Sequence, residues 1–223
     1  MNLRFLGHSA FQFVTGGRSI LVDPFIAGNP TCPVGTAELP ADVIVVTHAH
    51  GDHWGSTMDF ALKGALVIST PEICAYAQAR GAKHTRAMNI GGTASYDWGS
   101  VYMTPAWHSN SFPDGTYGGM PTGIVLELDG RRIYHAGDTN FFSDMALIGE
   151  RGLDLALLPI GDNYTMGPAE ALRAAAALRP KRVIPMHYNT FPVIRQDAQA
   201  FVDDCGAHEI AALALKPGET LSL

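Results

Sequence analysis

The fold is decided by a short apolar stretch, Val43-Ile44-Val45-Val46, followed at once by Thr47-His48-Ala49-His50-Gly51-Asp52-His53. The four apolar residues indicate a buried strand. Four of the next side chains, those of His48, His50, Asp52 and His53, are common metal ligands. Burying so many polar groups without a shared ion would cost free energy. The stretch therefore predicts a metal site at the end of a strand.

The spacing within this cluster predicts two adjacent groups of ligands. His48 and His50 are separated by one residue, so both side chains can face the same way in an extended segment. Gly51 allows the backbone to turn after them. Asp52 and His53 can then point toward a neighbouring position.

Three more candidate ligands follow apolar stretches elsewhere in the chain. His108 follows residues 101–107, Asp138 follows 133–137, and His187 follows 183–186. Ligands at strand ends lie where an α/β scaffold presents a binding site. Any one of these residues alone would be more typical of a core or a turn. Together with the cluster at 48–53 they predict a two-metal hydrolase.

Length and composition indicate one globular α/β domain spanning residues 1–223. The chain is 47% hydrophobic and 16% charged, with a net charge of −6. Strands are predicted at 3–6, 10–14, 18–22, 43–47, 65–69, 100–107, 123–128, 131–135, 154–159, 182–186 and 209–213. Helices are predicted at 71–81, 168–179 and from about 194 to a stop at Gly206.

The charge balance and the cysteines restrict the partners and the compartment. No long basic patch is present, which disfavours nucleic acid as a partner. Cys32, Cys74 and Cys205 are odd in number and widely spaced, as expected for free thiols in a reducing cytoplasm. The sequence has no signal-peptide pattern and no apolar run long enough to span a bilayer, so we expect a cytoplasmic protein without a membrane anchor.

The order His48-x-His50-x-Asp52-His53, His108, Asp138, His187 resembles the metallo-β-lactamase superfamily over nearly the whole chain. Shorter motifs resemble the UPF0173 metal-dependent hydrolases, relatives of the L-ascorbate-6-phosphate lactonase branch. These motifs are Leu6-Gly7-His8-Ser9, Val22-Asp23-Pro24-Phe25, His135-Ala136-Gly137-Asp138-Thr139, Thr165-Met166-Gly167-Pro168 and Met186-His187-Tyr188-Asn189-Thr190. The resemblance implies a four-layer αββα sandwich, with the metals at one edge of the two sheets.

The resemblance also implies a ligand assignment. His48, His50 and His108 would hold a first metal, and Asp52, His53 and His187 a second, with Asp138 bridging the two. Three imidazoles with an open position suit a catalytic metal. Histidine and aspartate ligands suit Zn²⁺ or Mn²⁺, and also Fe or Ni²⁺.

The expected reaction is hydrolysis of a small ester-like or lactone substrate by a metal-bound hydroxide. Asp52 and Asp138 are the candidate catalytic residues, and Asp52 can take up or deliver a proton. Two divalent ions bring four positive charges, and two carboxylates and a hydroxide bring three negative ones. The pocket then keeps about one positive charge, which favours an anionic or strongly polarised substrate.

Two residues are candidates for contacting and orienting the metal ligands. Asp23 could orient a ligand imidazole, as carboxylates often do; the alternative is a turn formed with Pro24. The family motif suggests that His8 lies near the metals, whereas a buried histidine at a strand end is an equal alternative.

Three further residues flank the expected ligands. His135 lies three residues before Asp138, and strand alternation points its side chain away from the metals unless it has a role of its own. Tyr188 and Asn189 follow His187 directly, so they could touch the substrate.

Two loops attract attention because of their glycines and prolines. Residues 26–40 form either an irregular surface connection or a surface for a second subunit, since homo-oligomers are common. Residues 109–121 start right after His108 and contain three glycines, so they could form a lid.

Two other functions remain open from the sequence. One is phosphodiester hydrolysis, including nucleic-acid processing in the manner of ribonuclease Z relatives, which the acidic balance disfavours. The other is a metal-binding assembly protein without turnover, which the complete ligand set disfavours.

Overall fold

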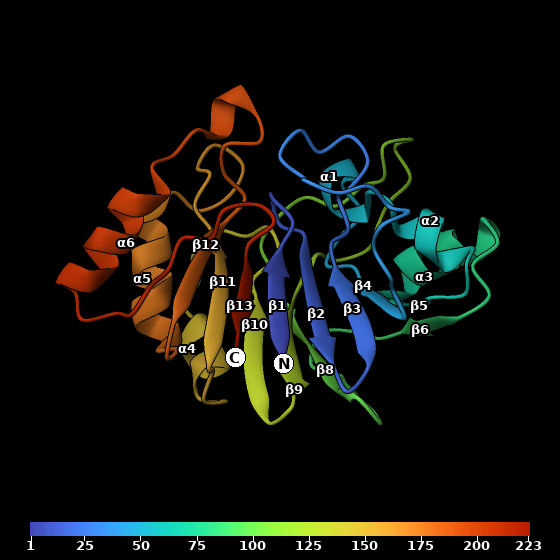
Figure 1. The fold of residues 1–223 in the computed structure, drawn as a ribbon, viewed down its shortest axis with the longest axis horizontal. Helices are drawn as coiled ribbons and strands as arrows, with labels where there is room; N and C mark the ends of the chain where they lie inside the picture. Colours follow the sequence, from blue (N-terminus) through green and yellow to red (C-terminus); the bar gives the residue numbers. More distant parts are fainter.

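Two β-sheets stack face to face, with helices on both outer sides (Figure 1). The computed structural model describes residues 1–223. This arrangement is the predicted four-layer αββα sandwich, and the fold prediction is confirmed.

The first sheet has seven strands. In spatial order they are β13 (Thr220–Ser222), β1 (Asn2–Phe5), β2 (Phe11–Thr15), β3 (Arg18–Val22), β4 (Val43–Val45), β5 (Leu66–Ser69) and β6 (Thr85–Ala87). Its outer face carries α2 (Thr57–Ala61) and α3 (Pro71–Ala79). The four-residue helix α1 (Gly51–Trp54) lies between β4 and α2 in the chain.

The second sheet has six strands. In spatial order they are β12 (Val183–Met186), β11 (Leu155–Pro159), β10 (Arg131–His135), β9 (Thr122–Leu128), β8 (Gly99–Pro105) and β7 (Thr93–Tyr96). Helix α5 (Pro168–Leu178) packs on β11 and contacts α4 (Met145–Gly149) and α6 (Ala198–Ala207). A short 3₁₀ turn, η1, covers Pro192–Ile194.

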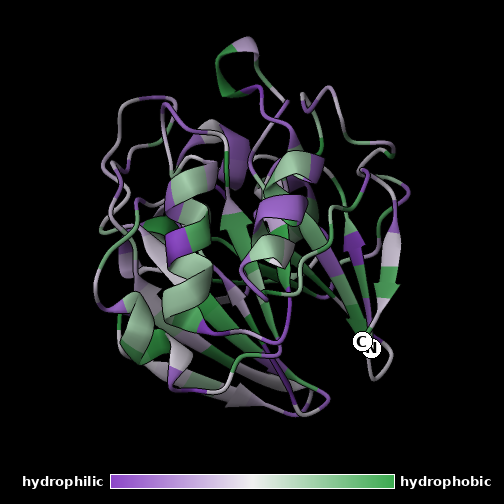
Figure 2. Ribbon diagram, turned by 90° about the vertical axis from the view of Figure 1, so that its left-hand side faces the viewer, coloured by the Kyte–Doolittle hydropathy of each residue, from purple (hydrophilic) through white to green (hydrophobic).

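Strand alternation divides the apolar residues of the first sheet between two layers. In β3 and β4, Ile20 and Val45 point into the core between the sheets, whereas Leu21 and Ile44 point toward the helices. The hydropathy colouring shows apolar strands behind helices of mixed character (Figure 2). Every layer thus buries one apolar face, as period-two strands require.

The direction of the strands brings the candidate ligands to one end of the sandwich. In the first sheet β1, β3 and β4 run the same way, and so do β8, β10 and β12 in the second. The candidate ligands and their neighbours follow the carboxyl ends of these strands. Distant parts of the sequence therefore meet at the same end of the sandwich.

Most predicted elements are confirmed to within a few residues, but one predicted strand is wrong and one helix starts later than predicted. Residues 209–213 form no strand and contribute only an isolated bridge, Val183 to Ala212. The third helix begins at Ala198 and runs through Gly206 to Ala207. It starts there because the carboxylate of Asp197 accepts hydrogen bonds from the amides of residues 199 and 200.

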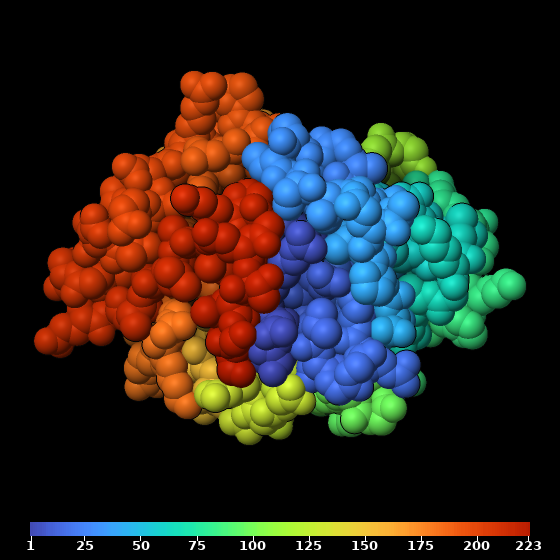
Figure 3. Space-filling model, viewed as in Figure 1, coloured from blue at the N-terminus to red at the C-terminus, as the bar shows by residue number.

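The elements that the sequence analysis missed are short. They are β6, β7, β13, α1, α2, α4 and the 3₁₀ turn η1, each of three to five residues. Strand β13 pairs with β1, so the two termini lie side by side (Figures 2 and 3). This closure supports our proposal that residues 1–223 form one domain.

The loop at 26–40 uses its apolar residues within its own chain. Ile26 and Leu39 are buried in the cluster beneath α2 and α3, and Cys32 and Val34 pack against it. Cys32, Cys74 and Cys205 are free thiols. None of the helices combines the length and apolar character needed to cross a membrane.

Replacing the cap of α6 should cost measurable stability. We expect Asp197→Ala to lower the free energy of unfolding by about 1 kcal/mol, because two helix amides lose their acceptor. Urea unfolding measures the change, and Asp204→Ala on the exposed face of the same helix is the control. Equal stability of both variants would contradict this account of the helix start.

Candidate metal centre

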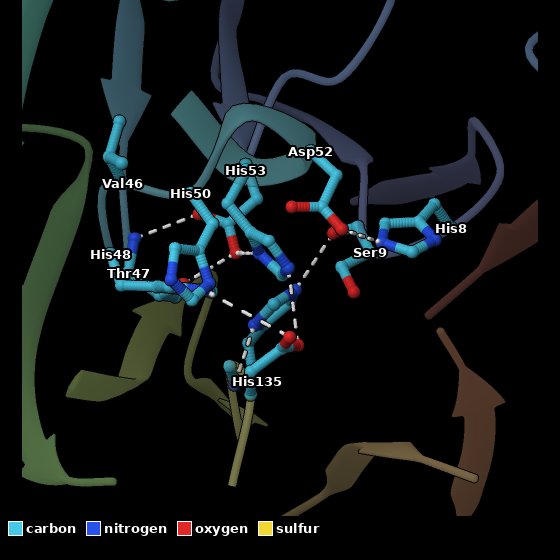
Figure 4. A network of polar contacts seen from close by, with 12 residues as sticks. His8, Ser9, Val46, Thr47, His48, His50, Asp52, His53 and His135 are labelled. Atoms are coloured by element: carbon cyan, nitrogen blue, oxygen red, sulfur yellow. Dashed lines mark hydrogen bonds and ion pairs between the residues drawn. The ribbon is translucent and has the colours of Figure 1, made fainter. Parts of the chain in front are cut away.

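Seven histidine and aspartate side chains converge where the two sheets meet. His48 and His50 follow β4, Asp52 and His53 lie in α1, and His108, Asp138 and His187 follow β8, β10 and β12. Figure 4 shows the imidazoles of His48, His50 and His53 directed toward a common region, with Asp52 beside them. All seven residues predicted from the sequence as metal ligands are brought together.

The first group consists of three imidazoles, those of His48, His50 and His108. Nε2 of His48 lies 3.1 Å from Nδ1 of His50, and Nε2 of His108 lies 3.2 Å from the same atom. A tetrahedral zinc with Zn–N bonds of about 2.0–2.1 Å separates its ligand nitrogens by about 3.3–3.4 Å. The spacing of the three nitrogens fits one cation bound between them.

The second group contains Asp52, His53 and His187, with Asp138 reaching toward both groups. Oδ2 of Asp138 lies 3.0 Å from Nε2 of His187 and 3.6 Å from Nε2 of His108, and Oδ1 lies 3.1 Å from Nε2 of His53. Asp138 is therefore placed between the two groups, as the bridging role requires.

Several of these atoms are buried without a hydrogen bond. Nε2 of His53, Oδ1 of Asp138 and Nε2 of His187 make no hydrogen bond of good geometry, although Nε2 of His53 lies 3.1 Å from Oδ1 of Asp138 and Nε2 of His187 lies 3.0 Å from Oδ2. Unpaired buried polar atoms are costly and rare in folded proteins. Their presence together indicates a common binding partner, and nitrogen and carboxylate donors suit a divalent cation.

Asp23 controls which ring nitrogens face the centre. It is fully buried, and its Oδ2 lies 2.7 Å from Nδ1 of His53 and accepts a hydrogen bond from the hydroxyl of Thr47. Oγ1 of Thr47 in turn lies 3.1 Å from Nδ1 of His48. This network assigns the proton to Nδ1 of both imidazoles, which leaves each Nε2 free for a cation. The orienting role predicted for Asp23 agrees with these contacts.

His8 lies in direct contact with the second group of candidate ligands. Its Nε2 is 3.1 Å from Oδ2 of Asp52, and its Nδ1 is 2.8 Å from Oγ1 of Thr190. Its ring centre is 4.0 Å from that of His187. Together with Asp52, His53 and His187, it forms a set of four potential donors. His8 thus either completes this set or holds Asp52 in place.

Three residues of the candidate metal centre have strained backbone conformations. His8, Asp23 and His187 adopt left-handed conformations, with φ values of 57°, 45° and 55°. Such conformations are unfavourable for residues other than glycine and cluster at functional sites. All three follow the end of a strand, where a sharp turn aims the side chain inward.

Burial and neighbouring charges shift the pKa values in the directions that ligation needs. Burial lowers the pKa of the imidazoles of His48, His50 and His108, which keeps them neutral. Burial opposes ionisation of Asp138, but His187 and His53 outweigh it and hold the pKa of the carboxyl well below its ordinary value. Metal ligation requires neutral imidazoles and ionised carboxylates.

His53 differs from the other histidines. Burial lowers the pKa of His53, but the carboxylates of Asp138 and Asp23 outweigh it and hold that pKa well above its usual range. Without a cation these carboxylates therefore keep a proton on the ring. A cation bound at Nε2 would displace this proton.

His135 faces away from the metal ligands, as strand alternation predicts. Its Nε2 lies 2.9 Å from the carbonyl oxygen of Ser9, and its Nδ1 accepts a hydrogen bond from the amide of Gly137. It therefore links the segment carrying His8 to the turn carrying Asp138. Gly137 is needed in that turn because its φ is +61° and a Cβ would lie 2.6 Å from the carbonyl oxygen of Thr122.

The structure does not bring Tyr188 or Asn189 to the pocket. Tyr188 is half-buried against the main core, where burial raises the pKa of its phenol. The side chain of Asn189 bonds the backbone amide and carbonyl of Gln196. These contacts fix the loop after β12, so the two residues shape the segment around His187 instead of lining the pocket.

One cavity of about 700 Å³ opens over His50 and Asp52. The loop at 109–121 forms one of its walls. Phe112 of this loop is buried in a core cluster, with its ring 5.3 Å from that of Trp54. Asp114 bonds the phenol of Tyr76 at 2.8 Å and the guanidinium of Arg80 at 3.0 Å.

The base of the same loop is held by Asn110. Its side chain accepts a hydrogen bond from the amide of Ala49 and donates to the carbonyls of Gly118 and Gly119. These anchors favour a fixed wall over the lid suggested by the glycines.

Sequence reasoning missed four residues that shape the site. Thr190 contacts His8, Asn110 holds the loop, and Phe25 and Phe191 line the cavity. Phe25 and Thr190 lie within motifs that were recognised, but no signal in the sequence indicated what they contact. Their roles come from contacts between segments far apart in the chain.

Comparison with known proteins gives the same class as the fold and the donor set. A family model described as the beta-lactamase superfamily domain matches residues 2–187. The solved structure of Igni18, a metallo hydrolase from the archaeon Ignicoccus hospitalis, superposes with a TM-score of 0.90 at 38% identity. The alignment covers 99% of this chain and 97% of that one. The fold and the site therefore define a metallo-β-lactamase superfamily protein.

Similar sequences specify the family. The chain is 57% identical over 223 residues to a UPF0173 metal-dependent hydrolase of Thermus thermophilus, covering 100% of this chain and 99% of the relative. It is 53% identical over 226 residues to another from Deinococcus radiodurans, covering 100% of both. The chain belongs to the UPF0173 family of metal-dependent hydrolases, and the predicted family is confirmed.

Removing the carboxylate of Asp23 should weaken metal binding without unfolding the protein. We expect Asp23→Asn to lower the affinity for Zn²⁺ by about 10–100-fold, because His53 and His48 lose the group that fixes their tautomers. Competition with a chromogenic chelator measures this. The control is Asp42→Asn, which alters a hydrogen bond to Ser19 at the opposite end of β3. The same affinity in both variants would contradict the orienting role.

The loop wall should depend on Phe112. We expect Phe112→Ala to destabilise the protein by about 3 kcal/mol and to speed amide exchange in residues 110–119, because the buried anchor is lost. Hydrogen-exchange mass spectrometry and urea unfolding measure both effects. Tyr117→Ala is the matched control, since that ring is 63% exposed. Rapid exchange of this loop in the unaltered protein would favour a lid.

Proposed function

We propose that this metal-dependent hydrolase cleaves a small ester-like or lactone bond at a two-metal centre. The observation that carries the proposal is the convergence of seven donors beside an open cavity, with several donor atoms buried and unpaired. In our assignment His48, His50 and His108 would hold one cation. Asp52, His53 and His187 would hold the other, and Asp138 would be shared by the two groups.

Bound divalent cations would supply Lewis-acid polarisation of the substrate and would lower the pKa of a bound water to about 7. The protein side chains hold the reacting groups in position and supply proton acceptors. Asp52 lines the cavity with its side chain 25% exposed, so it can receive a proton from an attacking water. Asp138 is 3% exposed and holds its place between the groups.

His8 is the residue that fixes the orientation of Asp52. In our assignment its Nε2–H donates to Oδ2 of Asp52, while the hydroxyl of Thr190 donates to Nδ1. Burial and the neighbouring His187 lower the pKa of His8 to about 4, which keeps the ring neutral in this arrangement. Oδ1 of Asp52 has no hydrogen bond in this arrangement and remains available.

A cytoplasmic location and a small-molecule substrate complete the proposal. The three free thiols support a reducing compartment. No lysine or arginine lines the cavity over the candidate ligands, so nothing there favours a phosphodiester or nucleic-acid substrate. Zn²⁺ and Mn²⁺ are the proposed metals, because both suit imidazole and carboxylate ligands.

Metal removal tests the proposal. Protein stripped by a chelator should lose hydrolysis of a lactone and ester panel, and should regain it when Zn²⁺ or Mn²⁺ is added. Elemental analysis should find two metal ions per chain. His50→Ala and His187→Ala should each reduce this number to one, because each removes a ligand of a different ion.

Other outcomes would decide against the proposal. One metal ion per chain in the unaltered protein would reject the two-metal assignment. Hydrolysis of bis-p-nitrophenyl phosphate without activity on any lactone or ester would favour a phosphodiesterase. Full metal loading without turnover on any of these compounds would favour a metal-binding protein without catalytic activity.

A further inference from the structure

The cavity over the candidate metal ligands has an apolar wall. Beyond His50 and Asp52 its lining consists of Phe25, Phe112, Phe191, Pro113, Ser111, Gly51 and Gly115. Asp52 is the only charged side chain among them, and it belongs to the proposed ligand set. The part of a substrate that lies outside the reacting bond would therefore meet aromatic carbon.

Phe25 and Phe191 form the centre of this wall. Their ring centres are 6.4 Å apart with 35° between the planes. Both rings meet the ring of His8 nearly edge-on, at 5.7 Å and 5.6 Å. His8 itself is fixed by Asp52 and Thr190, so the pair stands on a rigid base.

The two phenylalanines come from different halves of the fold. Phe25 follows β3 of the first sheet, and Phe191 follows β12 of the second. Both rings remain only partly buried, so apolar surface is left exposed beside the candidate ligands. Covering such surface with an uncharged ring gains free energy from water release and from aromatic contact.

The aromatic wall has no cationic side chain, and the proposed metal centre has no excess positive charge to attract an anionic group in its place. Asp23 is buried against His53 and adds a third carboxylate to Asp52 and Asp138. The excess of about one positive charge expected from the sequence omitted Asp23, and counting it removes that excess. An anionic substituent placed against the two phenyl rings would lose hydration without gaining a partner.

We propose that the substrate carries an uncharged aromatic or similarly flat apolar group that packs against Phe25 and Phe191, and no phosphate or carboxylate at that position. The inference rests on the proposed hydrolysis of a lactone or ester bond at this site. It replaces the anionic substrate expected from the sequence with a neutral one.

A matched pair of lactones tests this substrate class on the metal-loaded protein. γ-Phenyl-γ-butyrolactone and γ-carboxy-γ-butyrolactone share the reacting ring and differ only in the substituent. We expect kcat/KM to be at least about tenfold higher for the phenyl compound, the factor that one good aromatic contact with its buried area supplies. Equal rates, or a preference for the carboxylate, would overturn the inference while leaving the hydrolase proposal intact.

Variants of the aromatic pair identify the group responsible. Phe25→Ala and Phe191→Ala should each raise KM for the phenyl lactone several-fold with little change in KM for the carboxylate, whereas Phe191→Leu should retain most of the preference. Phe191→Lys should shift the preference toward the carboxylate. Leu147→Ala, an exposed position on α4, is the control. Unchanged preference in both alanine variants would overturn the assignment to this wall.

Binding without turnover separates the two proposals. 2-Phenyltetrahydrofuran and tetrahydrofuran-2-carboxylate lack the scissile carbonyl, and saturation-transfer NMR reports their binding. Binding of the phenyl compound that is lost in Phe191→Ala supports the substrate class even if neither lactone is cleaved, an outcome that would reject only the lactonase activity. Binding of the carboxylate alone would overturn the inference.

Discussion

The buried carboxylate of Asp23 is the interaction on which the rest of the site depends. It accepts hydrogen bonds from the amide and hydroxyl of Thr47 and lies against Nδ1 of His53. The end of β3 is thereby joined to the end of β4 and to α1. Through Thr47 the same carboxylate also sets the ring orientation of His48. One acidic group thus positions ligands in both halves of the proposed metal centre.

The second sheet is fastened to this arrangement by His135. Its ring bonds the carbonyl of Ser9 and the amide of Gly137, so it connects the turn after β1 with the turn after β10. The amide of His187 donates to the carbonyl of His8, which adds a link to the turn after β12. These buried contacts hold strand ends from both sheets together, and Asn110 adds a link from the loop at 109–121 to the segment that carries His48 and His50.

The sequence predicted the seven converging ligands because His48, His108, Asp138 and His187 come soon after apolar strands and because the spacing at 48–53 is specific. The αββα sandwich is implied only by the family resemblance that these motifs carry. The short helices α1 and α2 could not be predicted, since four or five residues show no helical period. The aromatic wall was also hidden, because Phe25 and Phe191 are 166 positions apart and meet only through the fold. The same holds for Thr190 against His8.

The anchoring of Phe112 and Asp114 has a consequence for selectivity. Because the loop at 109–121 is anchored to α3, the entrance of the cavity keeps a constant width. Water and unsuitable molecules then enter as freely as the true substrate, so no closing motion sorts them. Discrimination must come from shape complementarity between the ligand and a preformed cavity. The free energy needed to form that cavity is spent when the chain folds.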